Sequence, residues 1–245
     1  MTRLVHKDFA AFRDFICNYN LQALNGNAEF WQIYKSSHTM LYGIMALISE
    51  LNYIIEEKEA CGDDDEKVDI LDIEVEYLKE CFSDLSSTIF ISVHGAYKGA
   101  RLMLRSSIEM FLRGMFSKEV PEIQTEKNLY RVFESIKKAP SIVKDESYKI
   151  HFDEMHQIYA ELCAHAHTAS KLQMEEIYAL NLFPKFETDD LKKLSSTFKI
   201  LVRDYIFMIC HRFNKEFHTI HFENRQAILD CLNRKEKPIV MGVAD

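Results

Sequence analysis

Glycine and proline are scarce in this chain: its 245 residues include 7 Gly and 4 Pro. All four prolines fall between segments of regular helical periodicity, and they are Pro121, Pro140, Pro184 and Pro238. Long stretches therefore contain no residue that breaks a helix. No convincing run alternates apolar and polar residues as a half-buried strand does. The sequence predicts an all-α protein, an antiparallel bundle of long helices with shorter flanking helices.

Paired cysteines, an excess of basic residues and long apolar runs are also missing. The six cysteines form no Cys-x-x-Cys pair, which argues against a zinc finger or a disulfide framework. A formal net charge of -8 argues against a broad nucleic-acid-binding face, but it leaves room for a small basic pocket. Neither a secretory signal nor a run of about 18 uncharged apolar residues is present. We therefore expect a cytoplasmic protein that does not enter a membrane.

The signatures of several enzyme classes are absent. The chain has no Walker loop, no Gly-x-Gly-x-x-Gly and no Gly-x-Ser-x-Gly, so nucleotide-binding and triad hydrolase functions have no support. Neither Glu-x-x-His nor His-x-x-x-His occurs, and Asp153-Glu-Met-His156 is only a near match. We therefore expect no cofactor and no bound metal.

Apolar periodicity predicts where the helices lie. They are expected over residues 7–24, 28–60, 67–83, 86–117, 125–138, 147–168, 188–218 and 222–234. The longest of these would each span on the order of 45 Å at 1.5 Å per residue, so they must lie along one another. The helix at 86–117 is apolar on most of its circumference and is expected to be central. We expect one domain over 1–234 and a flexible tail over 235–245.

A row of charges crosses this apolar helix. The row consists of Arg101, Arg105, Glu109 and Arg113, which recur every four residues and so share one slowly drifting face. An uncompensated buried charge costs several kcal/mol, on the order of the whole stability of some domains. Such a row is therefore kept either as a closed ion-pair network or as a functional site.

A second feature is the histidine-bearing end of the helix expected at 147–168. Glu161 and His165 are four residues apart and lie on one face. His165 and His167 cannot share a face, so one of them can point toward the charged row. Arginine, glutamate and histidine together can move a proton and stabilise a developing anion. A lone histidine in a core is more often a hydrogen-bonded structural residue.

These two segments together resemble a known group of proteins. Ala-Arg-Leu-Met-Leu-Arg-Ser-Ser-Ile-Glu at 100–109 is followed by Tyr-Ala-Glu-Leu-Cys-Ala-His-Ala-His at 159–167. The pairing resembles a poorly characterised prokaryotic all-helical family that is distantly similar to the HEPN superfamily of helical ribonucleases, toxins and antiviral defence proteins. The resemblance covers roughly residues 85–170. It implies an RNA substrate, a homodimer and a partner protein from the same operon.

Carried over by position, the resemblance selects Arg105, Glu109 and His167, with Arg101 and His165 as neighbours. In a metal-independent cleavage of RNA, either histidine would act as general acid or base. The arginines at 101 and 105 would hold the phosphate, and the glutamate would orient an arginine or a histidine. The alternatives are a non-catalytic regulatory or scaffold bundle with a buried Arg/Glu/His network, and a small-molecule or metal-dependent bundle enzyme.

The chain departs from the usual HEPN ribonuclease motif, in which a polar residue follows an arginine and a histidine comes four to six residues after that arginine. Arg212 and His218 form the only such pair, and Phe213 takes the polar position. Six residues along an unbroken helix turn by about 240°, so we expect the two side chains to face apart. No strong helix breaker lies between them. The predicted chemistry therefore lies on the helix at 147–168.

Overall fold

The described part of the protein is all-helical. The computed structural model describes residues 3–18, 21–60, 67–166 and 184–242. Within these ranges the chain forms helices and turns but no β-strand, which confirms the all-α prediction there. Among the described helices, none combines the length and the apolar character needed to cross a membrane.

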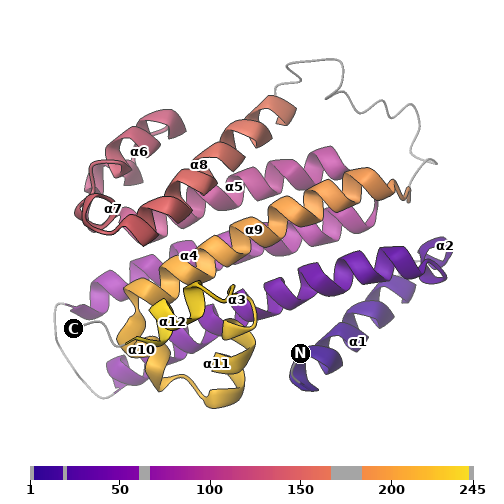
Figure 1. The fold of residues 1–245 in the computed structure, drawn as a ribbon, viewed down its shortest axis with the longest axis horizontal. Coiled ribbons are helices and arrows are strands. Elements are labelled where there is room, and N and C mark those ends of the chain that lie inside the picture. Colours follow the sequence, from indigo (N-terminus) through magenta and orange to yellow (C-terminus); the bar gives the residue numbers. More distant parts are fainter. Residues whose placement is uncertain (1–2, 19–20, 61–66, 167–183, 243–245) are drawn as a thin grey trace.

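The long helices lie along one another, as Figure 1 shows. They are α3 (Ala28–Ala60), α4 (Lys67–Val93), α5 (Tyr97–Phe116), α8 (Glu146–Ala166) and α9 (Thr188–Arg212). Each runs antiparallel to the long helix before it in the chain. Helix α5 packs against α4, α8 and α9, and α3 packs against α4 and α9. The helix that carries the charged row therefore contacts most of the bundle.

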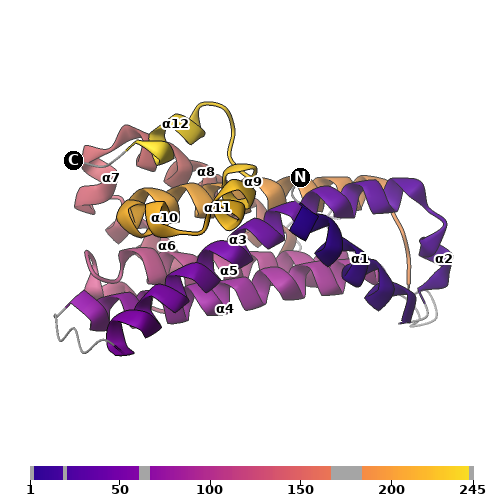
Figure 2. The same ribbon diagram turned by 90° about the horizontal axis from the view of Figure 1, so that it is seen from below.

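Shorter helices enlarge this bundle (Figure 2). They are α1 (Arg3–Asn18), α2 (Gln22–Asn25), the 3₁₀ helix η1 (Pro121–Gln124), α6 (Leu129–Ile136), α7 (Pro140–Lys144), α10 (Asn214–Thr219), α11 (Phe222–Leu229) and α12 (Glu236–Met241). Helices α1 and α11 pack on α3, α7 packs on α8, and α12 packs on α9. The flanking helices thus bury further surface of the long ones.

The buried face of α5 fixes the position of the core. Ala100, Leu104, Ile108 and Phe111 recur at intervals of three or four residues and are fully buried. The Phe111 ring stacks on Tyr205 of α9 with the ring centroids 4.1 Å apart. Because this face is apolar, the charged row lies on another face of α5, which meets α9, α8 and the η1 turn in succession.

The turn between α4 and α5 lies further along the chain than predicted. Leu85 is fully buried and continues the apolar face of α4 past the predicted break, so the helix ends only at Val93. The chain then turns at Gly95, whose φ of +80° lies in the left-handed region that favours glycine. A Cβ at Gly95 would lie 2.3 Å from the carbonyl oxygen of Lys185. Backbone conformation and close approach both require glycine here.

Replacing Gly95 by alanine is expected to lower the free energy of unfolding by roughly 1–3 kcal/mol, because the variant must adopt a strained conformation or shift the chain at Lys185. Gly26→Ala is the matched control, since its φ is -81° and an added Cβ there meets nothing within 4 Å. The control is expected to be neutral or slightly stabilising in chemical denaturation. Equal effects of the two changes would contradict the role of Gly95.

The helix predicted over 188–218 is broken in two. Helix α9 ends at Arg212, Phe213 takes a non-helical conformation with φ -100° and ψ 42°, and α10 begins at Asn214. Phe213 and Asn214 are both buried. Nδ2 of Asn214 donates to the carbonyl oxygen of Val240 at 2.7 Å. Tertiary packing therefore ends α9 where no glycine or proline signals it. The expectation of an unbroken helix is wrong.

The flexible tail predicted from residue 235 onward is also corrected. Residues Glu236–Met241 form α12, which packs on α9. Glu236 is buried because it joins a polar cluster with His151. Val240 is buried because it packs in the hydrophobic core. Residues 243–245 lie outside the described part of the chain.

Candidate functional site

A pocket lies where α5, α8 and α9 meet. Its volume is about 310 Å³, and its lining residues are Arg101, Glu161, Leu162, His165, Lys193, Leu194, Ser196 and Thr197. Lys193 and Ser196 are exposed, so the pocket opens to solvent on the α9 side. Two of the residues selected from the sequence, one from the charged row and one histidine, therefore line the same pocket.

Arg101 supplies the buried charge of this pocket. The residue is only 9% exposed. Its Nη2 donates to Oδ1 of Asp190 at 3.2 Å. Asp190 lies in the first turn of α9, where the helix dipole favours a carboxylate, and its side chain is partly exposed. The guanidinium therefore has a buried position, whereas the carboxylate paired with it is partly exposed.

His165 lies opposite on the last turn of α8. Burial lowers its pKa from the ordinary value of 6.5, because the charged form loses hydration, and the Arg101 guanidinium lowers it further. The carboxylates of Asp190 and Glu161 act in the opposite direction, but they do not reverse the shift. The imidazole is therefore neutral at pH 7 and can accept a proton.

Arg105 is held against α8 one turn further along. Its Nη2 donates to the Tyr159 hydroxyl at 2.8 Å and its Nε to Sγ of Cys163 at 3.2 Å. The guanidinium lies over the Tyr159 ring, 5.1 Å from the centroid. Burial raises the pKa of Tyr159 to about 12, so the phenol stays protonated. Arg105 therefore ties α5 to α8 and does not line the pocket.

The last two charges of the row form a structural clamp. Nη2 of Arg113 donates to Oε1 of Glu109 at 2.7 Å. The same guanidinium donates to the carbonyl oxygens of Ile123 and, at 2.9 Å, Glu126. These bonds hold the η1 turn against the end of α5. The charged row thus divides into a pocket residue, a tether and a clamp, and Glu109 belongs to the clamp.

His167 was selected from the sequence but lies outside the described residues. Its assignment stays a prediction. His165 is the last histidine of α8 in the described range, and it is the one that reaches the pocket.

Arg212 and His218 lie on separate helices and have separate surroundings. Arg212 donates to the carbonyl oxygen of Met115 and forms an ion pair with the buried carboxylate of Glu74. His218 lies on α10, and its Nε2 is buried without a hydrogen-bond partner among the described residues. No contact between the two side chains is found in that part of the chain. The prediction that they face apart rested on an unbroken helix, whereas the break at Phe213 now separates them.

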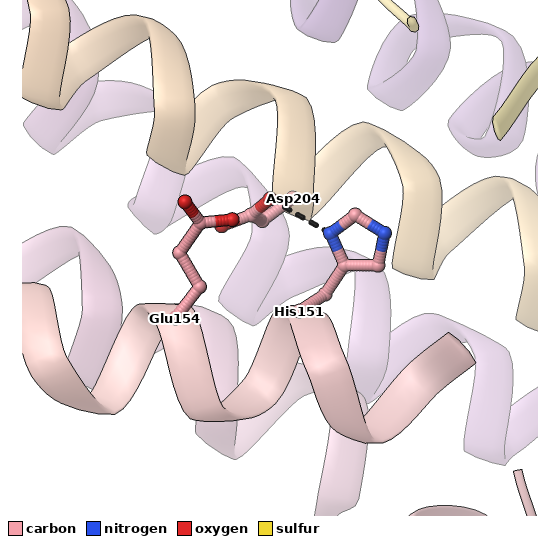
Figure 3. Close-up of side chains that lie close together, drawn as sticks. All are labelled: His151, Glu154 and Asp204. Carbon is pink, nitrogen blue, oxygen red and sulfur yellow. Dashed lines mark hydrogen bonds and ion pairs between the residues drawn. The ribbon is translucent and has the colours of Figure 1, made fainter. Parts of the chain in front are cut away.

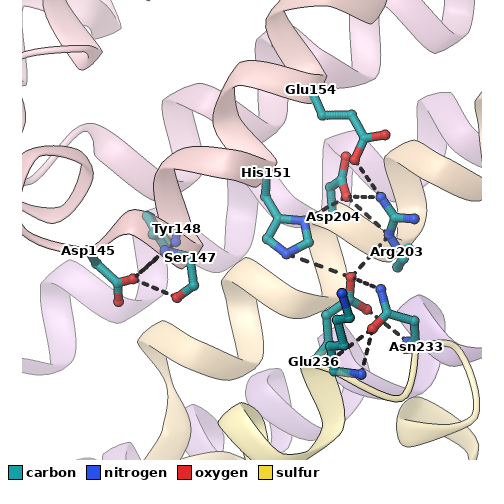
Figure 4. Close-up of polar contacts among 10 residues, drawn as sticks. Asp145, Ser147, Tyr148, His151, Glu154, Arg203, Asp204, Asn233 and Glu236 are labelled. Atoms are coloured by element: carbon teal, nitrogen blue, oxygen red, sulfur yellow. Dashed lines mark hydrogen bonds and ion pairs between the residues drawn. The ribbon is translucent and has the colours of Figure 1, made fainter.

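A second polar cluster lies between α8, α9 and α12 (Figure 4). Nδ1 of His151 lies 2.7 Å from Oδ1 of Asp204, and its Nε2 lies 3.7 Å from Oε1 of Glu236. Nη2 of Arg203 lies 2.5 Å from Oε2 of Glu154 and 2.9 Å from Oδ1 of Asp204. Its Nε lies 3.4 Å from Oε1 of Glu236. The cluster therefore places three carboxylates around one arginine and one histidine.

The members of this cluster differ in exposure. Asp204 is 0% exposed, and His151 and Glu236 are also buried. Oδ2 of Asp204 has no hydrogen-bond partner among the described residues. Glu154 and Arg203 are partly exposed and form the solvent edge. One side-chain nitrogen or oxygen from each of His151, Glu154 and Asp204 lies within 4.8 Å of the other two. Figure 3 shows these three side chains close together.

This cluster was not predicted from the sequence, although the sequence contains one signal of it. His151 and Glu154 are three residues apart on one helix face, the reverse of the Glu-x-x-His order that was sought. Arg203 and Asp204 interrupt an otherwise apolar run of α9. A charged pair in such a run indicates a buried partner. The partner could not be identified from sequence, because His151 and Asp204 are 53 residues apart.

No protein-family model, no curated protein and no solved structure matches this chain. The HEPN resemblance therefore rests on the residues of α5 and α8 alone. An all-helical bundle supports many unrelated functions, so a function must be argued from the pocket and the side chains that line it.

Proposed function

We propose that this chain is a HEPN-like helical protein that binds RNA at the pocket between α5, α8 and α9 and cleaves it without a metal ion. One observation carries the proposal: Arg101 and His165 line the same pocket of about 310 Å³. A buried guanidinium beside an uncharged histidine supplies an anion site and a base within one pocket.

The proposed chemistry uses these two residues. A phosphodiester oxygen takes the place of the Asp190 carboxylate on Arg101, and Lys193 at the rim adds a second positive charge. His165 accepts the proton of the ribose 2′-hydroxyl, and O2′ attacks the phosphorus. The bond from phosphorus to O5′ breaks, the departing oxygen takes a proton from a water molecule, and the imidazolium of His165 returns its proton to the hydroxide that remains. The products are a 2′,3′-cyclic phosphate and a 5′-hydroxyl.

A second candidate is favoured by the other three members of the charged row. Arg105 is tied to Tyr159, and Glu109 and Arg113 hold the η1 turn, so these three charges serve the fold. This observation favours a non-catalytic regulatory or scaffold protein. In that case the pocket binds an anion, and no bond is broken.

The proposal extends to assembly. The HEPN resemblance implies a homodimer and a partner protein from the same operon, as a toxin or an antiphage defence effector would need. Light scattering at micromolar concentration is then expected to give twice the 28.7 kDa of one chain. The mass of a single chain would argue against the dimer.

RNA binding tests the proposed site. We expect Arg101→Gln to weaken binding of a labelled single-stranded RNA by about tenfold or more, because the anion loses its buried partner. Binding by the unchanged protein is expected to fall as the salt concentration rises. The matched control is Arg131→Gln, which removes an equally charged side chain that is 72% exposed on α6.

The control is expected to leave RNA binding nearly unchanged. RNA binding without cleavage by the unchanged protein would favour the non-catalytic candidate. Equal binding by the Arg101→Gln and Arg131→Gln variants would reject this pocket as the RNA site.

A further inference from the structure

We propose that His151, Glu154 and Asp204 bind one divalent metal ion between α8 and α9 (Figure 3). Fourteen residues of α8 separate His151 from His165, which corresponds to about 21 Å along the helix. The metal site is therefore distinct from the proposed RNA pocket. It would join two long helices inside the bundle.

The possible ligand atoms of the three side chains lie close together. One imidazole nitrogen and two carboxylate oxygens already lie within 4.8 Å of one another. Two ligand atoms bonded to one ion at about 2.0–2.2 Å lie at most about 4.4 Å apart, so the three side chains must shift to bind one ion. The ring of His151 stacks on Phe207 with centroids 4.1 Å apart, which limits its rotation. Part of the ligand set is therefore held in place by packing.

The carboxylate of Glu236 lies near the other ring nitrogen of His151. When a histidine ligates a metal through one ring nitrogen, its other N–H usually donates to a carboxylate or a carbonyl. With Nδ1 of His151 on the metal, Nε2–H would point to Oε1 of Glu236, which lies 3.7 Å away. Glu236 of α12 is thus the carboxylate nearest to Nε2 of His151, and Nδ1, which now donates to Asp204, must lose its proton to bind a metal.

One oxygen of the Asp204 carboxylate is unsatisfied within the described part of the chain. Asp204 is completely buried, its Oδ1 faces His151 and Arg203, and its Oδ2 has no hydrogen-bond partner among the described residues. A buried carboxylate oxygen without a partner is costly. A cation between Asp204 and Glu154 would satisfy it.

The cluster has more carboxylates than arginines. The cluster contains the carboxylates of Glu154, Asp204 and Glu236 but only one arginine, Arg203. Buried charge must be compensated, and a bound divalent ion would add two positive charges beside these carboxylates. Arg203 occupies part of this role, since its guanidinium contacts both metal-ligating carboxylates.

Arg203 and the metal ion would therefore compete. The Arg203 side chain is 24% exposed, so it can withdraw toward solvent while its Nε keeps the contact with Glu236. Glu154 is the more exposed ligand and gives the ion its path of entry. The ligand set of one imidazole and two carboxylates suits Mn²⁺ or Zn²⁺ better than a soft ion such as Cu⁺.

Mn²⁺ binding to metal-depleted full-length protein tests the proposal. We expect one Mn²⁺ per chain in equilibrium titration, a rise in the melting temperature, and ¹⁴N modulation from one imidazole in pulsed electron paramagnetic resonance. His151→Gln should abolish the nitrogen signal and weaken binding by at least about tenfold, and Asp204→Asn should weaken binding by a similar factor. Zn²⁺ should compete for the same site.

The matched control is His156→Gln, which removes another histidine of α8 that stacks on Phe133. It should leave both the affinity and the nitrogen signal unchanged. The proposal is overturned if the folded protein binds no stoichiometric Mn²⁺ or Zn²⁺, or if binding survives both the His151 and the Asp204 changes.

Arg203→Met separates a metal site from an ion-pair network. If Arg203 competes with the metal, this variant should bind Mn²⁺ at least about tenfold more tightly and regain melting temperature when Mn²⁺ is added. A network without a metal function predicts no binding and no recovery. The result is independent of the RNA pocket, because RNA binding is scored separately with Arg101→Gln.

Discussion

Replacing His165 by glutamine is expected to reduce RNA cleavage by about 10²–10⁴-fold, because a general acid–base group contributes a factor of this size. The affinity for RNA should change little, since Arg101 and Lys193 remain in the pocket. Single-turnover cleavage of a labelled RNA measures the rate, and a binding titration measures the affinity. A loss of affinity as large as the loss of rate would mean that His165 binds RNA and does not act on its proton.

The matched control for this change is His156→Gln. His156 lies on the same helix, and burial lowers its pKa as well, but it faces Phe133 and Lys137. Cleavage by this variant should equal that of the unchanged protein. A similar loss in both variants would point to a general effect on α8.

The pH dependence of cleavage should report the lowered pKa of His165. The pKa of His165 in the folded protein lies below 6.5, so the imidazole is still unprotonated when the pH falls to 6.5. The acidic limb of kcat/KM is therefore expected below pH 6.5. Arg101→Gln removes a positive charge near His165, so the pKa of His165 should rise. The acidic limb of the remaining activity should therefore move to higher pH. An unchanged limb in this variant would separate Arg101 from His165.

Replacing Arg203 by methionine should lower the free energy of unfolding by about 3–5 kcal/mol in the presence of a chelator, because the carboxylates of Glu154, Asp204 and Glu236 lose their arginine. Chemical denaturation at neutral pH measures the change. The control is Lys192→Met on the same helix, whose ion pair with Glu29 is exposed and should contribute little. A loss no larger than that of the control would show that the buried cluster does not stabilise the fold.

The sequence predicted the helical class and singled out two of the residues that line the pocket, for clear physical reasons. Scarce breakers and regular apolar spacing determine helices largely from local residues. The four-residue spacing placed Arg101 on one face of α5, and the two-residue spacing of His165 and His167 required that only one face the row. The structure brings Arg101 and His165 into one pocket.

What the sequence could not predict depends on contacts between distant residues. The break after Arg212 results from burial of Phe213 and from the bond between Asn214 and Val240. Glu109 looked like a member of the site, because nothing in its local sequence shows that Arg113 reaches the η1 turn. Local spacing gives the face of a helix, and only the fold determines what that face meets.

The most direct test of the proposed function is cleavage of one RNA oligonucleotide and its 2′-O-methyl counterpart in the presence of a chelator. The account predicts that the RNA is cut to a 2′,3′-cyclic phosphate and a 5′-hydroxyl. The methylated strand should bind but stay intact, because it has no 2′-proton for His165 to accept. Cleavage of the methylated strand, or binding of both strands without cleavage, would contradict the account.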